Sequence, residues 1–260
     1  MTVTLDQIHR FPVKGLAGER LPAGTPTAGQ ALPHDRRFGL TMGGTAAGLD
    51  MSGEDWISYK QFYALSSEER LAQLGLEFDE ASETVIITRG GKPVARGKPA
   101  EPLGRTLLDQ FFAAFLAGNP RGTPKLVAGR RDAARAVAFT DTPAPTVSLL
   151  NLASVADLER VARAPVDPRR FRANLWLAGL PAWSEMPWPG QEIPVGAARL
   201  KVIEPIERCS ATAVNLETAQ RDLAIPRILQ SGYGHLCMGG YAQVVAGGEV
   251  REGDAVALTQ

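Results

Sequence analysis

The thiol of Cys209 is the side chain of this sequence best suited to chemistry, because it directly follows Arg208. A neighbouring cation lowers the pKa of a thiol and makes the thiolate available as a nucleophile or as a ligand for a soft metal. A buried structural cysteine is the default alternative for a lone cysteine. That alternative is stronger for Cys237, which lies among apolar residues and glycines at 235–240.

Basic and apolar residues alternate in the segment 167–176. If the segment is extended, Arg170, Arg172 and Asn174 share one face and apolar residues share the other. Guanidinium groups present paired, permanently charged donors that suit a phosphate or a carboxylate. A solvated strand face with incidental arginines is an equally open interpretation of this segment.

Further cations occur near the N-terminus. Lys14 follows Pro12, which is expected to end the first strand, so the lysine side chain is expected to project from a loop. Arg36 and Arg37 alternate at the start of a strand, and we therefore expect only one of them to point into a shared site. Each of these residues is weak evidence by itself, because most lysine and arginine side chains are simply solvated.

Several common sites are not indicated by the sequence. The glycine-rich segment 43–48 lacks the Gly-Lys-Ser/Thr ending of a phosphate-binding loop and is interpreted as a flexible turn. The histidines His9, His34 and His235 do not have zinc-ligand spacing. There is no Gly-x-Ser-x-Gly motif of a hydrolase. Two cysteines are too few for a disulfide framework or a four-cysteine iron–sulfur cluster within one chain.

The composition is that of a globular protein whose balanced charges produce no strong overall electrostatic field. The 28 Lys and Arg residues balance 28 Asp and Glu residues, so nothing favours nucleic acid or an anionic membrane as a partner. The N-terminus lacks the apolar core of a signal peptide, and no stretch is apolar enough for a transmembrane helix. We expect a cytoplasmic protein with free thiols.

Short strands joined by turns are predicted throughout, because 27 Gly and 19 Pro punctuate the sequence. The expected strands are Thr2–His9, Arg37–Met42, Thr84–Thr88, Asn174–Ala178, Ala198–Ile203, Tyr241–Ala246 and Ala255–Thr259. Two helices are expected: Leu107–Leu116, apolar on nearly every side and so well buried, and Ser154–Arg163, which begins like a capping box. A Gly/Pro/Asn-rich stretch at 117–124 is the expected boundary, dividing the chain into residues 1–119 and 120–260.

These segments, in this order, resemble the MOSC family, named after the C-terminal domain of molybdenum-cofactor sulfurase. The most specific match is Arg208-Cys209-x-x-Thr212-x-Val214. The resemblance also rests on Phe11-Pro12-Val13-Lys14-Gly15, Asp35-Arg36, Asn151-Leu152-Ala153-Ser154, Arg170-Phe171-Arg172-Ala173-Asn174 and the closing stretch from Gly240-Tyr241 to Gly253-Asp254. Members with an N-terminal β-barrel partner look most similar, a group that includes the mitochondrial amidoxime-reducing component and a bacterial homologue fused to a ferredoxin.

The resemblance implies a strand-rich α/β fold, with a smaller N-terminal barrel-like domain before a barrel-like MOSC domain and the cofactor where the two meet. Cys209 would be the catalytic residue and would ligate molybdenum, or tungsten in the analogous cofactor. The residues that would bind the pterin or phosphate, or support the pocket, are Lys14, Arg36, Asn151, Ser154, Arg172, Asn174, Arg208 and Thr212.

The sequence departs from the family pattern at four places. Gly15 replaces the usual serine, which removes a hydroxyl near the expected phosphate. Asn215-Leu216 stands where Asp-Pro is common, Ala219 where a turn glycine is common, and Cys237 where an apolar aromatic is usual. These changes keep the expected metal ligand and alter the expected substrate pocket.

The leading hypothesis is a molybdenum-dependent reductase of small N-hydroxylated or related N–O or S–O compounds. The sequence carries no ferredoxin-like cysteine cluster, so electrons are expected from a separate ferredoxin-type or flavin-type protein. One alternative is a carrier of the cofactor or of a persulfide without turnover of its own. Another is a degenerate member whose basic pocket binds a different phosphate-bearing ligand such as pyridoxal phosphate.

Overall fold

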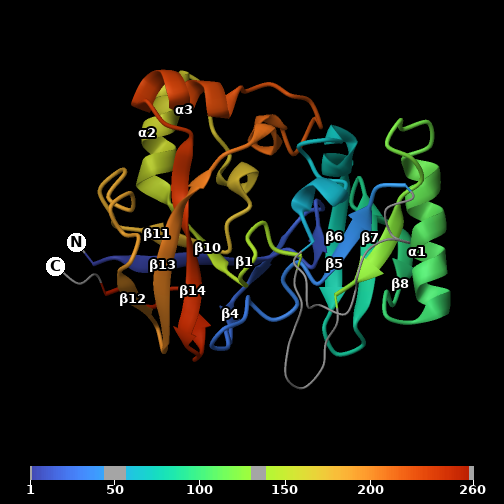
Figure 1. The fold of residues 1–260 in the computed structure, drawn as a ribbon, viewed down its shortest axis with the longest axis horizontal. Coiled ribbons are helices and arrows are strands. Elements are labelled where there is room, and N and C mark those ends of the chain that lie inside the picture. The colour runs from blue at the N-terminus through green and yellow to red at the C-terminus, as the bar shows by residue number, and fades with distance from the viewer. Residues whose placement is uncertain (1, 44–56, 130–138, 258–260) are drawn as a thin grey trace.

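The computed structural model describes residues 2–43, 57–129 and 139–257, and within them the chain forms one large sheet and three small ones (Figure 1). The large sheet has the strand order β12–β13–β14–β10–β11–β1–β3 and curls into a half-barrel. Its strands are β12 (Glu192–Val195), β13 (Ala198–Glu207), β14 (Cys237–Ala246), β10 (Val147–Asn151), β11 (Leu175–Ala178), β1 (Thr4–Arg10) and β3 (Glu19–Leu21). Its pairs are antiparallel, except that β10 and β11 are parallel.

Alternating side chains bury both faces of this sheet where β10 and β11 lie. Leu149 and Leu175 belong to the core on one face, whereas Leu150 and Trp176 belong to the core on the other. This follows from the two-residue period of a strand. The second face is covered by α2 (Leu152–Ala162) and α3 (Ile225–Tyr233), which Figure 1 shows together at one end of the sheet.

The other part of the molecule is built on two three-stranded sheets and one helix. One sheet has the order β2 (Val13–Lys14), β5 (Phe38–Thr41) and β9 (Lys125–Ala128). The other has the order β6 (Leu74–Asp79), β7 (Thr84–Arg89) and β8 (Lys92–Gly97). The helix α1 (Pro102–Phe115) packs against β8 and β9, and a shared apolar core joins these elements.

The remaining elements are short. β4 (Ala23–Gly24) pairs with β15 (Val250–Arg251), which brings the two ends of the described chain together. The short 3-10 helices are η2 (Tyr59–Gln61), η3 (Glu69–Gln73), η4 (Pro168–Phe171) and η5 (Ser210–Ala213). No helix within residues 2–43, 57–129 and 139–257 has the length and apolar character needed to cross a membrane.

The strand-rich α/β class predicted from the sequence is confirmed, with local differences. Six of the expected strands are present, but the expected strand Ala255–Thr259 has only isolated bridges at Ala255 and Val256 among its described residues. The expected helix Leu107–Leu116 lies within α1, but the expectation that it is well buried holds for one side only, because Leu107 is 48% exposed while Leu108 and Phe112 are buried. The glycine-rich turn expected at 43–48 lies outside the described residues from position 44 onward.

Strand pairing does not follow the expected boundary between residues 119 and 120. The N-terminal strands β1 and β3 belong to the large sheet, and β9 pairs with β5 in the other part. Strands far apart in sequence pair wherever their backbone donors and acceptors are satisfied, and linker composition does not reveal this. The division at 119/120 stays a prediction.

Candidate functional site

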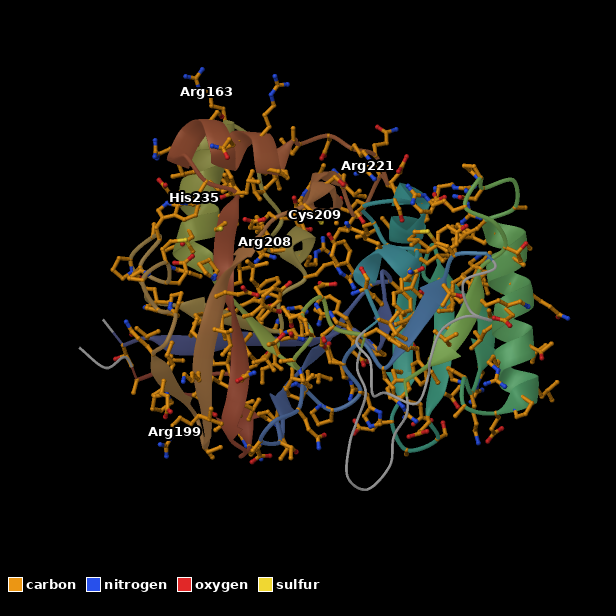
Figure 2. The ribbon with its side chains drawn as sticks, in the orientation of Figure 1. Arg163, Arg199, Arg208, Cys209, Arg221 and His235 are labelled. Carbon is orange, nitrogen blue, oxygen red and sulfur yellow. The ribbon has the colours of Figure 1, made fainter. Side chains whose placement is uncertain are left out.

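A cavity of about 570 Å³ lies between the large sheet and the other part of the molecule, and Cys209 lines it. We call it the Cys209 pocket. Figure 2 shows Arg208 and Cys209 near the junction of the two parts. The polar and sulfur-bearing side chains used below line this cavity: Lys14, Arg36, Asp141, Arg172, Arg208, Cys209, Cys237 and Tyr241. Chain segments far apart in sequence thus meet around one exposed thiol.

Arg208 is fixed in the core directly beside this thiol. It follows the end of β13, where its backbone N–H donates to the carbonyl of Leu236 at 3.0 Å. Its guanidinium is buried and donates through Nε to the Met238 carbonyl at 2.8 Å and through Nη1 to the Phe171 carbonyl at 3.0 Å. Burial lowers the pKa of Arg208 to about 10, so the group stays charged at neutral pH. The expected cation next to Cys209 is therefore present.

The backbone around Cys209 is held by short-range hydrogen bonds. Thr212 donates from its hydroxyl to the Cys209 carbonyl at 2.9 Å and from its backbone N–H to the same carbonyl at 3.2 Å. Cys209 is the N-cap residue of η5, and its side chain makes no capping hydrogen bond. Thr212 thus positions the cysteine backbone, and it is not among the residues that line the pocket.

Arg221 joins the Cys209 loop to the other part of the molecule. Its guanidinium donates to the Ser210 carbonyl at 2.7 Å and to the carbonyls of Leu65 and Ser66 at 2.8 and 3.2 Å. It also forms an ion pair with Glu69. Because Leu65, Ser66 and Cys209 all line the pocket, Arg221 connects two segments of its wall.

Lys14 comes from β2, and its ammonium group is buried against the segment 139–141. It donates to the Phe139 carbonyl at 2.9 Å and forms an ion pair with Asp141. Burial lowers the pKa of Lys14, and Asp141 opposes that shift. Burial also opposes ionisation of Asp141, but Lys14, Arg36 and Arg172 together hold the pKa of this carboxyl below its usual value. Asp141 belongs to no recognisable sequence motif and was not among the expected site residues.

Arg36 and Arg172 converge on the ring of Phe11. Their guanidinium carbons lie 5.0 and 4.4 Å from the ring centroid, the favourable position for a cation over an aromatic face. Arg36 also forms an ion pair with Asp35 and donates to the Arg172 carbonyl at 3.0 Å. Burial, followed by repulsion from Arg36, lowers the pKa of Arg172 to about 10. Three cations in all, with Lys14, surround one side of the pocket.

Gly15 has a physical reason to differ from the serine of the family pattern. Its φ of +87° lies in the left-handed region. A Cβ at this position would lie 2.6 Å from the Tyr63 carbonyl oxygen, closer than real Cβ contacts allow. The local backbone of this chain therefore excludes the hydroxyl that a serine would supply.

The expected extended segment 167–176 is wrong over most of its length. Residues 168–171 form η4, and Arg172 has a φ of +51°, so only β11 is a strand. Arg170 turns away to form an ion pair with Asp222 at 2.8 Å, while Arg172 faces the Cys209 pocket. Proline after Asp167 supports a tight helical start, which the alternation of residue types had concealed.

Asn174 lies in the core and not on the pocket wall. Its side-chain oxygen accepts from the backbone N–H and hydroxyl of Ser148 at 3.0 and 2.9 Å. Its amide nitrogen donates to the His9 carbonyl at 3.1 Å. Arg36 approaches the same oxygen at 3.5 Å, at the limit of a hydrogen bond. Asn174 thus connects three strand regions, and its side-chain oxygen contacts the Arg36 guanidinium.

Asn151 and Ser154 are committed to Glu185 and do not line the Cys209 pocket. The Asn151 amide donates to Glu185 at 2.8 Å, and the Ser154 hydroxyl donates to the same carboxylate at 2.7 Å. The expectation that Ser154 begins the helix is also wrong, because Asn151 is the N-cap of α2 and accepts from the Ala153 N–H at 3.0 Å.

Two further side chains complete the pocket. Tyr241 of β14 lines it, and burial raises the pKa of its hydroxyl, so the group stays protonated. Cys237 is half-buried in the same cavity, and burial raises the pKa of its thiol. As predicted, only Arg36 of the pair Arg36 and Arg37 lines the pocket, because Arg37 forms an ion pair with Glu83.

Comparisons with known proteins give one domain assignment. Residues 137–257 match the model of the MOSC domain. Solved structures that resemble the chain include the YUAD protein of Bacillus subtilis, with 12% identity, a TM-score of 0.44, and coverage of 98% of this chain and 94% of that one. The YiiM proteins of Geobacillus stearothermophilus and Escherichia coli have 21% and 20% identity and TM-scores of 0.35 and 0.34; each match covers 44% of this chain and 54% of that one.

Proteins of curated function give no match to the chain. The domain match contains Asp141, Arg172, Arg208, Cys209 and Tyr241, whereas Lys14 and Arg36 come from the part of the chain before it. The family of this domain is associated with the molybdenum cofactor in general. Residues 137–257 therefore contain a MOSC domain, and a β-rich part of the chain precedes it.

Proposed function

We propose that the chain binds a molybdenum cofactor in the Cys209 pocket, with the Cys209 thiolate as the protein ligand of the metal. The observation that carries this proposal is one exposed thiol beside a fixed, charged Arg208, in a cavity that also presents Lys14, Arg36 and Arg172. A thiolate is a soft ligand, and guanidinium and ammonium groups suit the anionic end of a pterin cofactor.

The residues present fit such a group in size and in charge. A cavity of about 570 Å³ lies within the usual range for a cofactor or drug-sized ligand. Lys14, Arg36 and Arg172 outnumber the carboxylates of Asp35 and Asp141 beside them, so this side of the wall retains positive charge, whereas Glu204 and Glu207 line the cavity elsewhere. Asp141 fits least well, because it holds Lys14 in an ion pair that a phosphate would have to share or displace.

Each side chain has a role that its position supports. Cys209 would bind the metal, and the charged Arg208 directly precedes it in the chain. Lys14, Arg36 and Arg172 would bind the anionic part of the cofactor, with the cation–π contacts to Phe11 keeping the two guanidiniums in place. Tyr241 stays protonated and would donate a hydrogen bond. When bound, the cofactor supplies two-electron redox chemistry that the side chains themselves lack.

The reaction that we favour is the reduction of a small N-hydroxylated compound or a related N–O or S–O compound. For a hydroxylamine-type group, R–NHOH with two electrons and two protons gives R–NH₂ and water. The electrons would come from a separate ferredoxin-type or flavin-type protein. The alternative is a carrier that holds the cofactor, or a persulfide on Cys209, without turnover.

Metal and pterin content of the protein from a cofactor-competent host tests the binding proposal. We expect near-stoichiometric molybdenum with pterin in the wild type, and loss of molybdenum or an altered coordination shell in Cys209→Ala. Cys237→Ala is the matched control, because it removes a second thiol from the same pocket and should keep the metal. Tungsten is measured in the same samples. A folded wild type without metal or pterin, from a host that loads other molybdoenzymes, would refute the proposal.

Turnover of the loaded protein separates the reductase from the carrier. The assay supplies an artificial one-electron reductant and an N-hydroxylated substrate, and it measures formation of the reduced product. We expect turnover by the wild type and none by Cys209→Ala. A fully loaded wild type that reduces no N–O or S–O compound would leave cofactor binding intact and would favour the carrier.

A further inference from the structure

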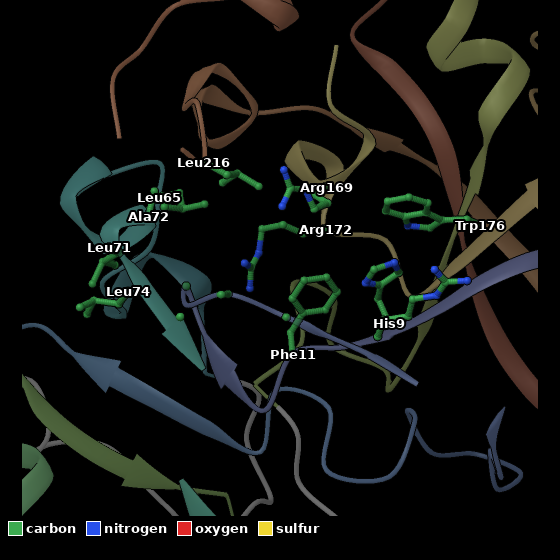
Figure 3. A pocket seen from close by; sticks show the side chains of 15 residues that line it. His9, Phe11, Leu65, Leu71, Ala72, Leu74, Arg169, Arg172, Trp176 and Leu216 are labelled. Atoms are coloured by element: carbon green, nitrogen blue, oxygen red, sulfur yellow. The ribbon is translucent and has the colours of Figure 1, made fainter. Parts of the chain in front are cut away.

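A second cavity, of about 440 Å³, lies on the other side of Arg172 (Figure 3). We call it the Trp176 pocket. It shares Gly15, Leu65 and Arg172 with the Cys209 pocket, and its other lining residues are different. The two cavities are therefore neighbours with one guanidinium in common.

The walls of the Trp176 pocket are apolar on two opposite sides. Leu65, Leu71 and Leu74 line it from the other part of the molecule, together with Ala72 and Leu216. Figure 3 shows these side chains on one side of Arg172 and Phe11, with Trp176 and His9 on the other. Such walls favour an apolar or aromatic body, because burying it removes apolar surface from water.

The aromatic side of the pocket is flat and uncharged at neutral pH. His9 stacks on Trp176 with ring centroids 4.4 Å apart and an interplanar angle of 25°. Burial, and then the positive charge of Arg20, lower the pKa of His9 to about 4. Next to it, Gly18 leaves room for the ring of Phe11, since a Cβ there would lie 2.4 Å from a ring carbon. The stacked rings of His9 and Trp176 thus form a flat aromatic wall against which a planar ligand can pack.

The charge of the pocket is positive and only partly neutralised. Its lining includes Arg20, Arg169 and Arg172 but no acidic side chain. Arg20 is bound by both carboxylate oxygens of Glu252, and Arg169 by both of Asp167. Within the described parts of the chain, the guanidinium of Arg172 forms no ion pair, and the one hydrogen bond that it donates goes to the Leu16 carbonyl. Its guanidinium therefore keeps donors for an anion.

We propose that the Trp176 pocket binds a planar aromatic monocarboxylate, with the carboxylate on Arg172 and the ring between the leucine wall and the aromatic wall. A guanidinium without an ion-pair partner among the described residues matches one carboxylate, to which it can donate hydrogen bonds. Because Arg172 also lines the Cys209 pocket, a ligand bound in one cavity changes the position of this guanidinium, or the charge that it presents to the other cavity. The proposal rests on the lining of the Trp176 pocket, but a cofactor bound to Arg172 from the Cys209 pocket would compete with the carboxylate for the same guanidinium.

The test uses the purified full-length chain and a matched pair of probes. Naphthalene-1-acetate supplies a flat ring and a carboxylate, and naphthalene-1-acetamide is its neutral counterpart of nearly the same shape. Calorimetric titration should give a roughly ten- to hundredfold lower Kd for the acid, which is the range for a hydrogen bond to a charged group. Equal affinities for the acid and the amide would overturn the role of Arg172.

Three variants locate the site. In Arg172→Gln the preference for the acid should disappear while binding of the amide remains. Ala72→Trp and Leu216→Trp fill the pocket from two different segments, and each folded variant should lose both probes. Ala100→Trp is the control, because Ala100 is exposed and lines neither pocket. Normal binding by both folded pocket-filling variants would place the probe elsewhere and would refute the proposal.

Discussion

The buried amide of Asn174 offers a direct test of whether a residue of the predicted cofactor set acts on the fold or on a ligand. Its side chain makes three hydrogen bonds of 2.9–3.1 Å to Ser148 and to the His9 carbonyl. These bonds connect β10, β1 and the start of β11. Replacement by leucine removes the amide and keeps nearly the same side-chain volume, so the cost is that of the lost hydrogen bonds rather than of a cavity.

The expected loss in the free energy of unfolding is about 2–4 kcal/mol. The buried Ser148 N–H loses its acceptor and the buried His9 carbonyl loses a donor, and each unsatisfied group costs on the order of 1–3 kcal/mol. The Ser148 hydroxyl costs less, because it still accepts from the backbone N–H of residue 174. A loss of this size is a large fraction of the ~5–15 kcal/mol that stabilises a typical domain.

Urea unfolding followed by circular dichroism measures this free energy. Gln230→Leu, an exposed amide on α3, is the control and should change the free energy of unfolding by less than about 0.5 kcal/mol. The double variant with Ser148→Ala should cost less than the sum of the two single changes, because the two side chains bind each other. An Asn174→Leu protein with unchanged stability that no longer binds the cofactor would refute the structural role.

Three further changes have definite expected outcomes. Ser154→Ala leaves the buried Glu185 carboxylate without its closest donor, so the free energy of unfolding in urea should fall by about 1–3 kcal/mol. The metal content of the folded variant should not change. A lower metal content with unchanged stability would contradict the assignment of Ser154 to Glu185. Arg221→Ala releases the loop that carries Cys209 and should speed alkylation of this thiol by iodoacetamide; an unchanged rate would count against the loop contact. The pKa of His9 is lowered from 6.5 to about 4 in the folded chain, so the unfolded chain binds more protons between these values. The free energy of unfolding should therefore fall as the pH drops from 6.5 to 4, and His9→Phe should reduce that fall; identical pH dependence in both proteins would show that the imidazole is not buried.

Regular alternation of buried and exposed residues made most strands predictable. In β13, Ala198, Leu200 and Val202 are buried while Arg199 and Lys201 point outward, as a strand with one buried face requires. The same rule failed at 167–176, where alternating arginines suggested a strand. There a proline at the first helical position and an arginine in the left-handed conformation form a tight turn instead.

Only some of the candidate site residues could be recognised from the sequence. Arg208 and Cys209 are neighbours in the chain, so their chemistry could be inferred without a fold. Asp141 and Tyr241 had no such signal, because they reach the pocket from segments that are far from Cys209 in the chain. Asn151 and Ser154 have residue types that suit a polar site, but both turn toward Glu185.

The sequence by itself determined the strand-rich class, the adjacent Arg208–Cys209 pair and the family resemblance, because each depends on residue types and their spacing along the chain. Only the tertiary structure decided which cations meet. Tertiary packing brings Lys14, Arg36 and Arg172 around one cavity, directs Arg170 to Asp222 and encloses Asn174 in the core. Side chains share a site when the fold makes their separation small, and separation in space is set by contacts between residues that are far apart in the chain.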